Sequence, residues 1–322
     1  MELKGVYTAI VTPFSDGKVD FKKLVALVEI QIEAGIDGIV PVGTTGESPT
    51  LSVEEHIEVI EKVINTAKGR CKVIAGSGAN STEEAIYLTR HAKAAGADAT
   101  LQVTPYYNKP TQEGLYRHFS AVAENGGLPV VLYNVPGRCG VPIAVETIAR
   151  LSTNKNIIAV KEAGGSVERV SAILDACNIT VLSGDDALTI PMMAVGATGI
   201  ISVVSNLVPR EVKEMVDAFA AGDCAKAKAL HMRLYPLFRD MFIETNPIPI
   251  KAAMAEKGLI REEYRLPLCP MSGNDDDLVE VGHFASVKGI TIIIAEAVQI
   301  FVKMGGIHYP VRRSSTSDRR AA

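Results

Sequence analysis

Lys161 is the residue whose position in this sequence predicts the most specific chemistry. It follows the apolar run Ile157–Val160, which is typical of a strand buried on both faces, and a glycine pair comes soon after it. Burial disfavours the ammonium form and lowers the pKa of a lysine, which makes its amine a candidate nucleophile for carbonyl substrates. The alternative is an ordinary ion pair at a strand end, for example with Glu162.

Hydroxyl, phenol and guanidinium groups follow other apolar runs. Thr44 and Thr45 lie in a glycine-flanked loop whose N–H groups and hydroxyls suit a small carboxylate, although a turn before a helix cap explains the pattern as well. Tyr133 is placed to donate and accept a proton beside an imine, or simply to pack at a strand end. Arg138 follows a Pro-Gly turn, where its guanidinium suits either a substrate carboxylate or a surface ion pair.

Eight short apolar runs, alternating with helical patterns, must position these groups. The runs are Tyr7–Val11, Gly38–Val42, Lys72–Ala75, Ala99–Val103, Pro129–Tyr133, Ile157–Val160, Thr180–Ser183 and Gly199–Val203. Capping-box patterns at Ser52 and Ser81 mark two of the helix starts. This alternation predicts an α/β fold, a closed (β/α)8 TIM barrel, rather than an open sheet, and the sequence has no G-x-G-x-x-G between a strand and a helix. The active site of such a barrel lies at the carboxyl ends of its strands.

Amphipathic segments after the eighth run predict appended C-terminal helices at Pro209–Ala221, Cys224–Met241 and Asn246–Lys257. We expect the barrel in residues 1–222, a helical region in 223–281 and an atypical, partly disordered tail in 282–322. The apolar run Ile290–Val302 in that tail is too short and too interrupted to span a bilayer.

Composition and charge argue against several classes of protein. The net charge of −4 and the dispersed basic residues do not indicate a nucleic-acid surface. Five widely separated cysteines have neither disulfide-framework nor zinc-site spacing, so we expect a reducing cytoplasm and no metal. The N-terminus has no basic segment followed by a long apolar core, so we expect a soluble protein without a signal peptide.

Five motifs, in order and at matching separations, resemble those of the dihydrodipicolinate synthases. They are GTTGES at 43–48, TPYYN at 104–108, YNVPGR at 133–138, IIAVKEA at 157–163 and LSGDD at 182–186. The resemblance covers about residues 1–272 and places the chain in the class I aldolase and N-acetylneuraminate lyase superfamily. It implies a lyase that condenses pyruvate with L-aspartate 4-semialdehyde to 4-hydroxy-tetrahydrodipicolinate, on the route to diaminopimelate and lysine. The reaction would use an imine on Lys161, which acts as an electron sink, and no cofactor.

The resemblance also implies roles for single residues. The implied catalytic residues are Lys161, Tyr133, Thr44 and Tyr107. Tyr133, Thr44 and Tyr107 would form a proton relay, with Tyr107 reaching in from a neighbouring subunit of a homotetramer built as a dimer of dimers. The implied substrate-binding residues are Thr45 for the pyruvate carboxylate, Arg138 for that of the semialdehyde, Ile201 through its carbonyl, and Gly184.

A pocket for inhibition by L-lysine is a further implication of the resemblance. Its residues would be Ser48, His56, Asn80, Glu84 and Tyr106. Val53 stands where some lysine-sensitive relatives have histidine, and a capping box explains Glu84 equally well.

Two other functions remain open. The same Lys161 imine would serve aldol cleavage of a 2-keto-3-deoxy sugar acid, although Arg138 suits a short semialdehyde with a carboxylate better than a polyol chain. A catalytically silent binding barrel is the second alternative. The presence of Lys161, Tyr133, Thr44 and Arg138 together argues against it.

Overall fold

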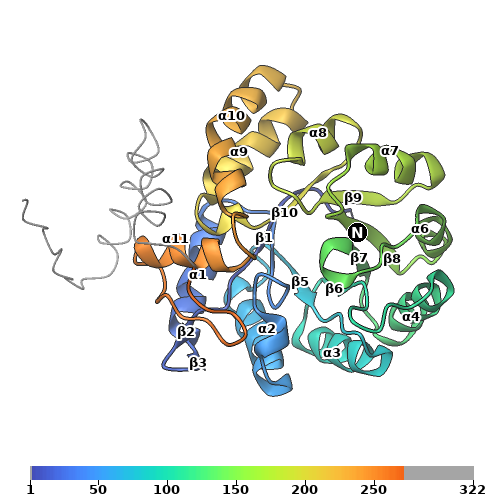
Figure 1. Cartoon of the computed structure of the whole chain (residues 1–322), viewed down its shortest axis with the longest axis horizontal. Coiled ribbons are helices and arrows are strands. Elements are labelled where there is room, and N and C mark those ends of the chain that lie inside the picture. The colour runs from blue at the N-terminus through green and yellow to red at the C-terminus, as the bar shows by residue number, and fades with distance from the viewer. Residues whose placement is uncertain (1, 272–322) are drawn as a thin grey trace, which may run out of the picture. The chain divides into compact units, whose positions relative to one another are not determined.

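The computed structural model describes residues 2–271, and eight parallel strands in this part of the chain close into a barrel. The strands are β1 (Gly5–Ala9), β4 (Gly38–Val40), β5 (Lys72–Gly76), β6 (Ala99–Val103), β7 (Val130–Asn134), β8 (Ile157–Glu162), β9 (Thr180–Ser183) and β10 (Gly199–Ser202). Figure 1 shows them at the centre of a ring of helices. The predicted (β/α)8 barrel is therefore confirmed. The predicted tail, residues 282–322, lies outside the described residues.

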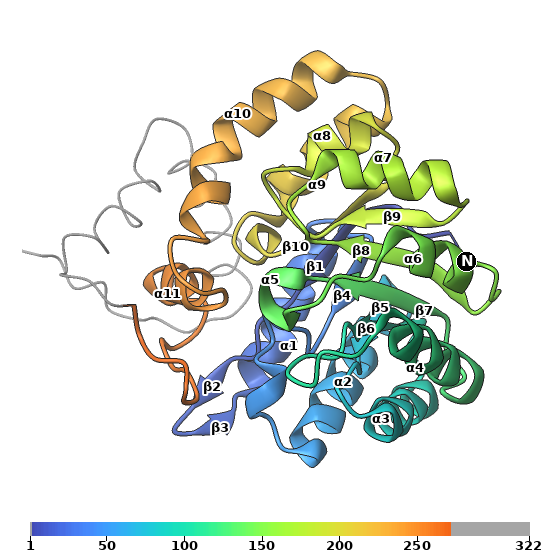
Figure 2. The same cartoon turned by 45° about the vertical axis from the view of Figure 1, so that its right-hand side comes forward.

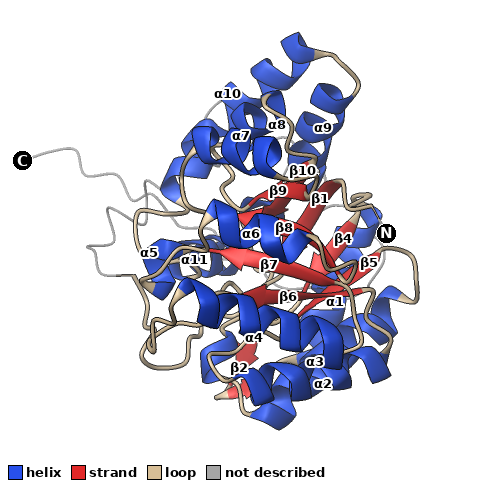
Figure 3. Ribbon diagram, turned by 90° about the vertical axis from the view of Figure 1, so that its right-hand side faces the viewer, coloured by secondary structure: helices blue, strands red, loops and turns tan. Residues whose placement is uncertain are grey.

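The helices cover the outer face of the barrel, as Figure 3 shows. They are α1 (Phe21–Glu33), α2 (Val53–Ala67), α3 (Thr82–Ala95), α4 (Gln112–Asn125), α6 (Val145–Ser152), α7 (Val167–Ala176), α8 (Thr189–Ala194) and α9 (Pro209–Ala220). Because α9 packs against β1, it is the eighth helix of the barrel, which corrects the prediction that Pro209–Ala221 is an appended helix. Within residues 2–271, no helix is both long enough and apolar enough to cross a membrane.

Two appended helices and several short elements complete the described chain. The appended helices are α10 (Cys224–Asp240) and α11 (Ile248–Glu256), both visible in Figure 2. The short elements are the hairpin β2 (Phe14–Ser15) with β3 (Lys18–Val19), the single turn α5 (Pro136–Cys139), and the 3₁₀ turns η1 (Ser48–Thr50) and η2 (Val204–Asn206). Helices α5 and α11 both lie at the end of the barrel toward which the β7 arrow points, which is the expected active-site end (Figure 3).

Side-chain caps begin the helices that the sequence marked. The Ser52 hydroxyl accepts from the Glu55 N–H at 3.2 Å, and the Glu55 carboxylate accepts from the Ser52 N–H at 3.0 Å, which completes the predicted box. The Ser81 hydroxyl accepts from the Glu84 N–H at 3.4 Å. In the described chain only this half of the second predicted box forms.

The pairing of β7 with β8 decides which side chains enter the barrel. A register shift between Val130 and Val131 brings Tyr133 opposite Lys161 and Asn134 opposite Glu162. Tyr133 belongs to the buried cluster that fills the barrel. Because successive side chains of a strand point to opposite faces, Tyr133 and Lys161 face the interior, whereas Asn134 and Glu162 face the helices.

Candidate active site

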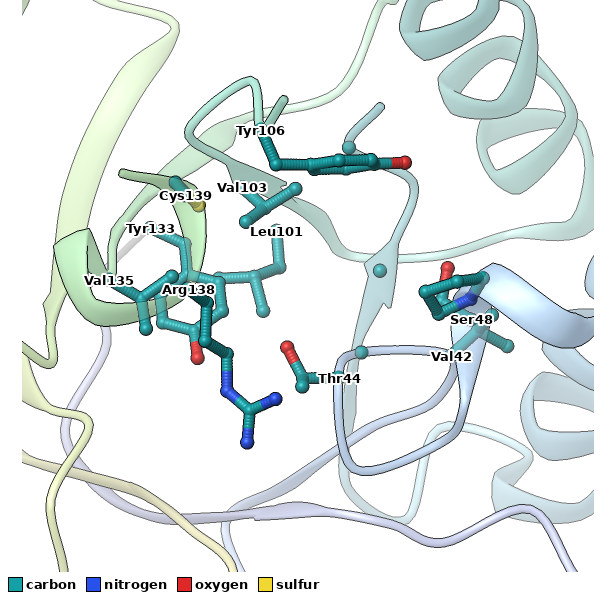
Figure 4. Close-up of a pocket in the computed structure, with 14 residues that line it drawn as sticks. Val42, Thr44, Ser48, Leu101, Val103, Tyr106, Tyr133, Val135, Arg138 and Cys139 are labelled. Atoms are coloured by element: carbon teal, nitrogen blue, oxygen red, sulfur yellow. The ribbon is translucent and has the colours of Figure 1, made fainter. Parts of the chain in front are cut away.

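A pocket of about 210 Å³ opens at the carboxyl ends of β4 to β7. Three of the side chains predicted for catalysis and substrate binding, Thr44, Tyr133 and Arg138, line it and point toward a common space (Figure 4). Most of the remaining wall is apolar and consists of Val42, Leu101, Val103, Val135 and Cys139, and Tyr106 and Ser48 also line the pocket. An apolar wall with a few converging polar groups is the usual form of a small-molecule site.

Lys161 lies next to this pocket, on the interior face of β8. Its side chain is only 5% exposed, and its Nζ atom lies 4.3 Å from the centroid of the Tyr133 ring. Glu162, the ion-pair partner considered from the sequence, faces the other way and pairs with Arg169 at 2.9 Å. The alternative interpretation, an ion pair between Lys161 and Glu162, is therefore wrong. The buried amine beside a phenol remains as the arrangement that sequence reasoning predicted for imine chemistry.

Gly184 lies against the Lys161 side chain, and Ile201 lies in the interior of the barrel. A Cβ atom added to Gly184 would lie 2.9 Å from Cε of Lys161 and 2.7 Å from Cβ of Ala163, so glycine leaves the space that the lysine side chain occupies. Ile201 is fully buried, pairs with Tyr7 on β1, and belongs to the same interior cluster as Tyr133. The fold thus places Gly184 against Lys161, and Ile201 in the same interior cluster as Tyr133.

The GTTGES loop presents its two threonines differently. A tight turn holds the loop, in which the Glu47 N–H donates to the Thr44 carbonyl at 3.1 Å. The Thr44 side chain lines the pocket, whereas Thr45 is buried and its hydroxyl accepts from Nδ2 of Asn246 at 3.0 Å. Nη2 of Arg138 donates to the carbonyl of the same Asn246 at 2.9 Å. Asn246 therefore contacts both residues predicted to bind substrate carboxylates.

Sequence reasoning missed Asn246 as a site residue. The signal was its place just before Pro247, at the entry to a helix that follows the barrel, but it was interpreted only as the start of that helix. Its partners, Thr45 and Arg138, are 201 and 108 residues away along the chain. No local pattern connects residues so far apart.

Two other ionisable groups near the site have an environment that limits their chemistry. Burial raises the pKa of the Cys139 thiol in the pocket wall to about 11, so it is neutral at pH 7 and does not compete with Lys161 as a nucleophile. Asp186 of the LSGDD motif is buried, and burial raises the pKa of its carboxyl group to about 6. Its carboxylate accepts from Ser202 Oγ at 2.5 Å and from the Val203 N–H at 3.0 Å, so it holds the turn after β10. Within residues 2–271, no cluster of three histidine, cysteine or acidic residues is suited to a metal ion.

Three of the residues predicted for a lysine pocket, Ser48, Asn80 and Glu84, lie around a fourth, Tyr106. Ser48 and Tyr106 line the pocket, and Nδ2 of Asn80 donates to the Tyr106 carbonyl at 3.2 Å. Burial and, to a smaller extent, the nearby Glu84 carboxylate raise the pKa of the Tyr106 phenol. The fifth residue, His56, is buried in α2, and its Nε2–H donates to the Gly76 carbonyl at 2.7 Å instead of lining the pocket.

Tyr107 stands apart from the other predicted catalytic residues. Its side chain is 91% exposed, at a φ of 70°, and it does not line the pocket of its own chain. Within one chain the structure therefore brings Thr44 and Tyr133 together in the pocket but leaves Tyr107 outside it.

The environment of His56 predicts that low pH destabilises the fold. Burial lowers the pKa of its ring to about 4, so the folded chain holds the neutral form. In the unfolded chain the His56 ring has its ordinary pKa of about 6.5, so it takes up a proton there more readily than in the folded chain. The free energy of unfolding therefore has its full value above pH 6.5 and falls as the pH drops toward 4, by up to about 3 kcal/mol. Urea unfolding at several pH values should show a shallower acid-side slope in His56→Gln than in the wild type. The half-buried His91 on α3 provides the control substitution, His91→Gln.

Comparison with known proteins gives the family. The model of the dihydrodipicolinate synthetase family matches residues 2–282. The chain belongs to this family. It is 57% identical over 281 residues to 4-hydroxy-tetrahydrodipicolinate synthase of Geotalea daltonii, which covers 86% of this chain and 97% of that protein. The five motifs are thus those of a dihydrodipicolinate synthetase family member, and the recognition made from them is confirmed.

Solved structures of the family agree with this fold. The 4-hydroxy-tetrahydrodipicolinate synthase of Methylacidiphilum fumariolicum superposes with a TM-score of 0.88 at 51% identity, covering 92% of this chain and 99% of that one. The chloride-inhibited dihydrodipicolinate synthase of Acinetobacter baumannii, complexed with pyruvate, superposes with a TM-score of 0.86 at 48% identity, covering 89% of this chain and 100% of that one.

Proposed function

We propose that this chain condenses pyruvate with L-aspartate 4-semialdehyde to 4-hydroxy-tetrahydrodipicolinate through an imine on Lys161. The chain is a lyase of lysine and diaminopimelate biosynthesis, the activity that its high-identity relatives carry. The observation that supports the imine most directly is the buried Lys161 amine, held against Tyr133 at the mouth of the barrel.

The proposed reaction uses Lys161 as both nucleophile and electron sink. Its neutral amine attacks the ketone carbon of pyruvate, and loss of water gives a protonated imine. The imine withdraws electrons from the adjacent methyl group, so that loss of a methyl proton gives an enamine. The enamine carbon then forms a bond to the aldehyde carbon of the semialdehyde. Finally the substrate's own amine attacks the imine carbon and displaces Lys161 as the ring closes.

The reaction has several proton transfers, and the Lys161 amine cannot carry out all of them. We assign the others to hydroxyl groups. The phenol of Tyr133 is able to donate and accept, and the Thr44 hydroxyl faces the same pocket. The electron sink is formed from the protein's own lysine and the substrate, so we propose that the reaction needs no cofactor.

The two substrate carboxylates are assigned to two groups of donors, the GTTGES loop and Arg138. The GTTGES loop with Thr45 would bind the pyruvate carboxylate through its hydroxyl and N–H groups. The Arg138 guanidinium, which is exposed beside the pocket and anchored through Nη2 to the Asn246 carbonyl, would bind that of the semialdehyde.

Assembly, regulation and location complete the proposal. A cytoplasmic homotetramer, a dimer of dimers, would use the exposed Tyr107 of one subunit in the relay of its neighbour. Native mass spectrometry tests the assembly, and a monomer with full activity would contradict it. L-lysine would bind around Tyr106 as an inhibitor, and unchanged activity in millimolar L-lysine would contradict that part.

Arg138→Leu tests the choice of the second substrate. Loss of a charge-assisted contact to the semialdehyde carboxylate is expected to lower kcat/KM for the semialdehyde by about 100-fold, corresponding to about 3 kcal/mol. The rate at which pyruvate forms a borohydride-trapped adduct should stay unchanged. Arg150→Leu removes a comparable guanidinium from a surface pair with Glu113 and is the matched control. Faster turnover of sugar aldehydes than of the semialdehyde would instead support the aldolase alternative.

A further inference from the structure

Behind the pair formed by Tyr133 and Lys161, four residues form a closed ring of hydrogen bonds on the outer face of the barrel. They are Asn134 on β7, Ile143 before α6, Glu162 on β8 and Arg169 on α7. Neither the roles implied by the five motifs nor the proposed reaction assigns a function to this ring. We call these four residues the outer ring.

Every bond of the outer ring is present in the structure. Nδ2 of Asn134 donates to Oε1 and Oε2 of Glu162 at 2.7 and 3.0 Å. Nε of Arg169 donates to Oε2 of Glu162 at 2.9 Å, and its Nη2 donates to the Ile143 carbonyl. The Ile143 N–H donates to Oδ1 of Asn134 at 2.9 Å, and this bond closes the ring.

Three members of the outer ring are buried and Arg169 is partly buried, and both oxygens of the Glu162 carboxylate are fully engaged. Asn134 and Glu162 are both fully buried, and the Gly164 N–H also donates to Oε1 of Glu162 at 2.7 Å. A Cβ atom at Gly164 would lie 2.6 Å from that oxygen, which accounts for the glycine after the lysine motif. Each Glu162 oxygen thus accepts two hydrogen bonds. A fully satisfied buried network of this kind holds its members in one arrangement.

The position of the outer ring connects it to the chemistry. Asn134 and Glu162 directly follow Tyr133 and Lys161, and both pairs face each other across β7 and β8. The bond between the Asn134 amide and the Glu162 carboxylate therefore crosses the two strands one residue beyond the reacting pair. A slip of one residue would turn every side chain of a strand to the other face, so a bond across the strands at this point fixes which groups meet inside.

The outer ring also closes the loop that carries Arg138. The Asn134 and Ile143 ends of the segment 135–142 are joined by the bond from the Ile143 N–H to Oδ1 of Asn134. Arg138 lies in the turn α5 between these ends. One buried network thus anchors the elements that present Tyr133, Lys161 and Arg138.

We propose that Asn134 and Glu162 are positioning residues for imine formation, which act by fixing Tyr133 against Lys161 through the bond between their side chains. The proposal rests on the proposed function, because the reaction that it concerns is the imine on Lys161. Neither residue faces the pocket, so neither is a catalytic residue.

The test measures formation of the Lys161 adduct with pyruvate, trapped by borohydride and followed by mass spectrometry of the full-length protein. In Glu162→Gln an amide NH2 replaces one carboxylate oxygen. Two hydrogen-bond donors then face each other, because the new NH2 lies against the Asn134 amide or the Gly164 N–H. In Asn134→Asp two carboxylates face each other. Each variant is expected to trap the adduct roughly 100-fold more slowly at saturating pyruvate, the size of loss that a small misplacement of reacting groups causes. The half-saturating pyruvate concentration should change much less.

The double variant Asn134→Asp/Glu162→Gln exchanges the amide and the carboxylate and so restores the bond across the strands. The new amide NH2 still takes the place of an oxygen that accepts from the Gly164 N–H or from Nε of Arg169, so the double variant is expected to recover part of the lost rate and to trap the adduct faster than either single variant. Glu113→Gln makes the same chemical change at a surface carboxylate that pairs with Arg117, and should trap at the wild-type rate. Val216→Ala, which truncates a buried side chain of α9, lowers stability without touching the outer ring and should also trap normally.

The results separate a positioning role from a purely structural one. Wild-type rates in both single variants, a folded double variant that recovers nothing, or an equal loss in Val216→Ala would each overturn the proposal. If Glu162→Gln does not fold, Asn134→Ala carries the test, because it leaves Glu162 bonded to Arg169 and Gly164. A wild-type chain that forms no adduct at all would overturn the proposed function instead.

Discussion

Lys161→Met is expected to lower kcat by a factor on the order of 10⁴ or more and to abolish the pyruvate adduct, because it removes the amine that we propose forms the imine. Methionine has an unbranched side chain of similar length and should fit the space beside Gly184. Lys161→Arg keeps the charge but offers a guanidinium that stays protonated, so it should be equally inactive.

Lys161→Met is expected to lose activity without losing stability. Lys161 is 5% exposed, and Glu162 is committed to Arg169 on the opposite face of β8. Replacing the buried amine by an apolar group removes a desolvation cost and breaks no ion pair with Glu162. Urea unfolding should therefore show unchanged or slightly higher stability, within about 1 kcal/mol. Trapping of pyruvate on another lysine, or substantial activity in the variant, would contradict the imine assignment and leave the silent barrel or another mechanism.

The barrel and the residues inside it were predictable because they depend on local patterns. Apolar runs that alternate with helical segments give the strands, and the position of Lys161 at the end of such a run gives the pocket end. The run alone left an ion pair as the simpler explanation for Lys161. It was the order of the five motifs that favoured catalysis, and the structure then placed Lys161 beside Tyr133.

Contacts between distant segments could not be predicted in this way. The register shift near Val130, which sets Tyr133 opposite Lys161, leaves no mark in the sequence, because either register satisfies the same apolar pattern. Asn246 and the outer ring depend on which loops meet after folding. The assignment of α9 was wrong for a similar reason, since an amphipathic segment does not reveal whether its apolar face meets β1 or another helix.

A second buried lysine, Lys251 on α11, differs from Lys161 in having a buried carboxylate partner. Its side chain and that of Glu47 are both 0% exposed, with Nζ and Oε1 2.5 Å apart, and Nζ also donates to the Thr12 carbonyl at 3.2 Å. Phe14 and Tyr264 place their rings 4.4 and 5.2 Å from the same Nζ. Burial lowers the pKa of Lys251, while the Glu47 carboxylate opposes the shift. This amine is enclosed by its partners and has no access to a substrate.

The ion pair joins α11 to the GTTGES loop. Glu47 has a φ of 55° at the end of that loop, a conformation that costs free energy in residues other than glycine and is held here by the surrounding contacts. Its second carboxylate oxygen accepts from the Arg265 N–H at 3.3 Å. Since Thr44 and Thr45 lie in the same loop, the ion pair supports the part of the site proposed to bind the pyruvate carboxylate.

Lys251→Met is therefore expected to destabilise the fold by about 3–5 kcal/mol, because it leaves the Glu47 carboxylate buried without its partner. The same substitution at Lys161 should leave the free energy of unfolding nearly unchanged. The two buried lysines therefore form a matched pair in one unfolding experiment. The double variant Lys251→Met/Glu47→Gln removes the uncompensated charge and should recover more than half of the loss. Lys226→Met breaks a half-exposed pair with Glu214 and should change stability by less than about 1 kcal/mol. Equal stability of Lys251→Met and Lys161→Met would show that the loop does not depend on the ion pair.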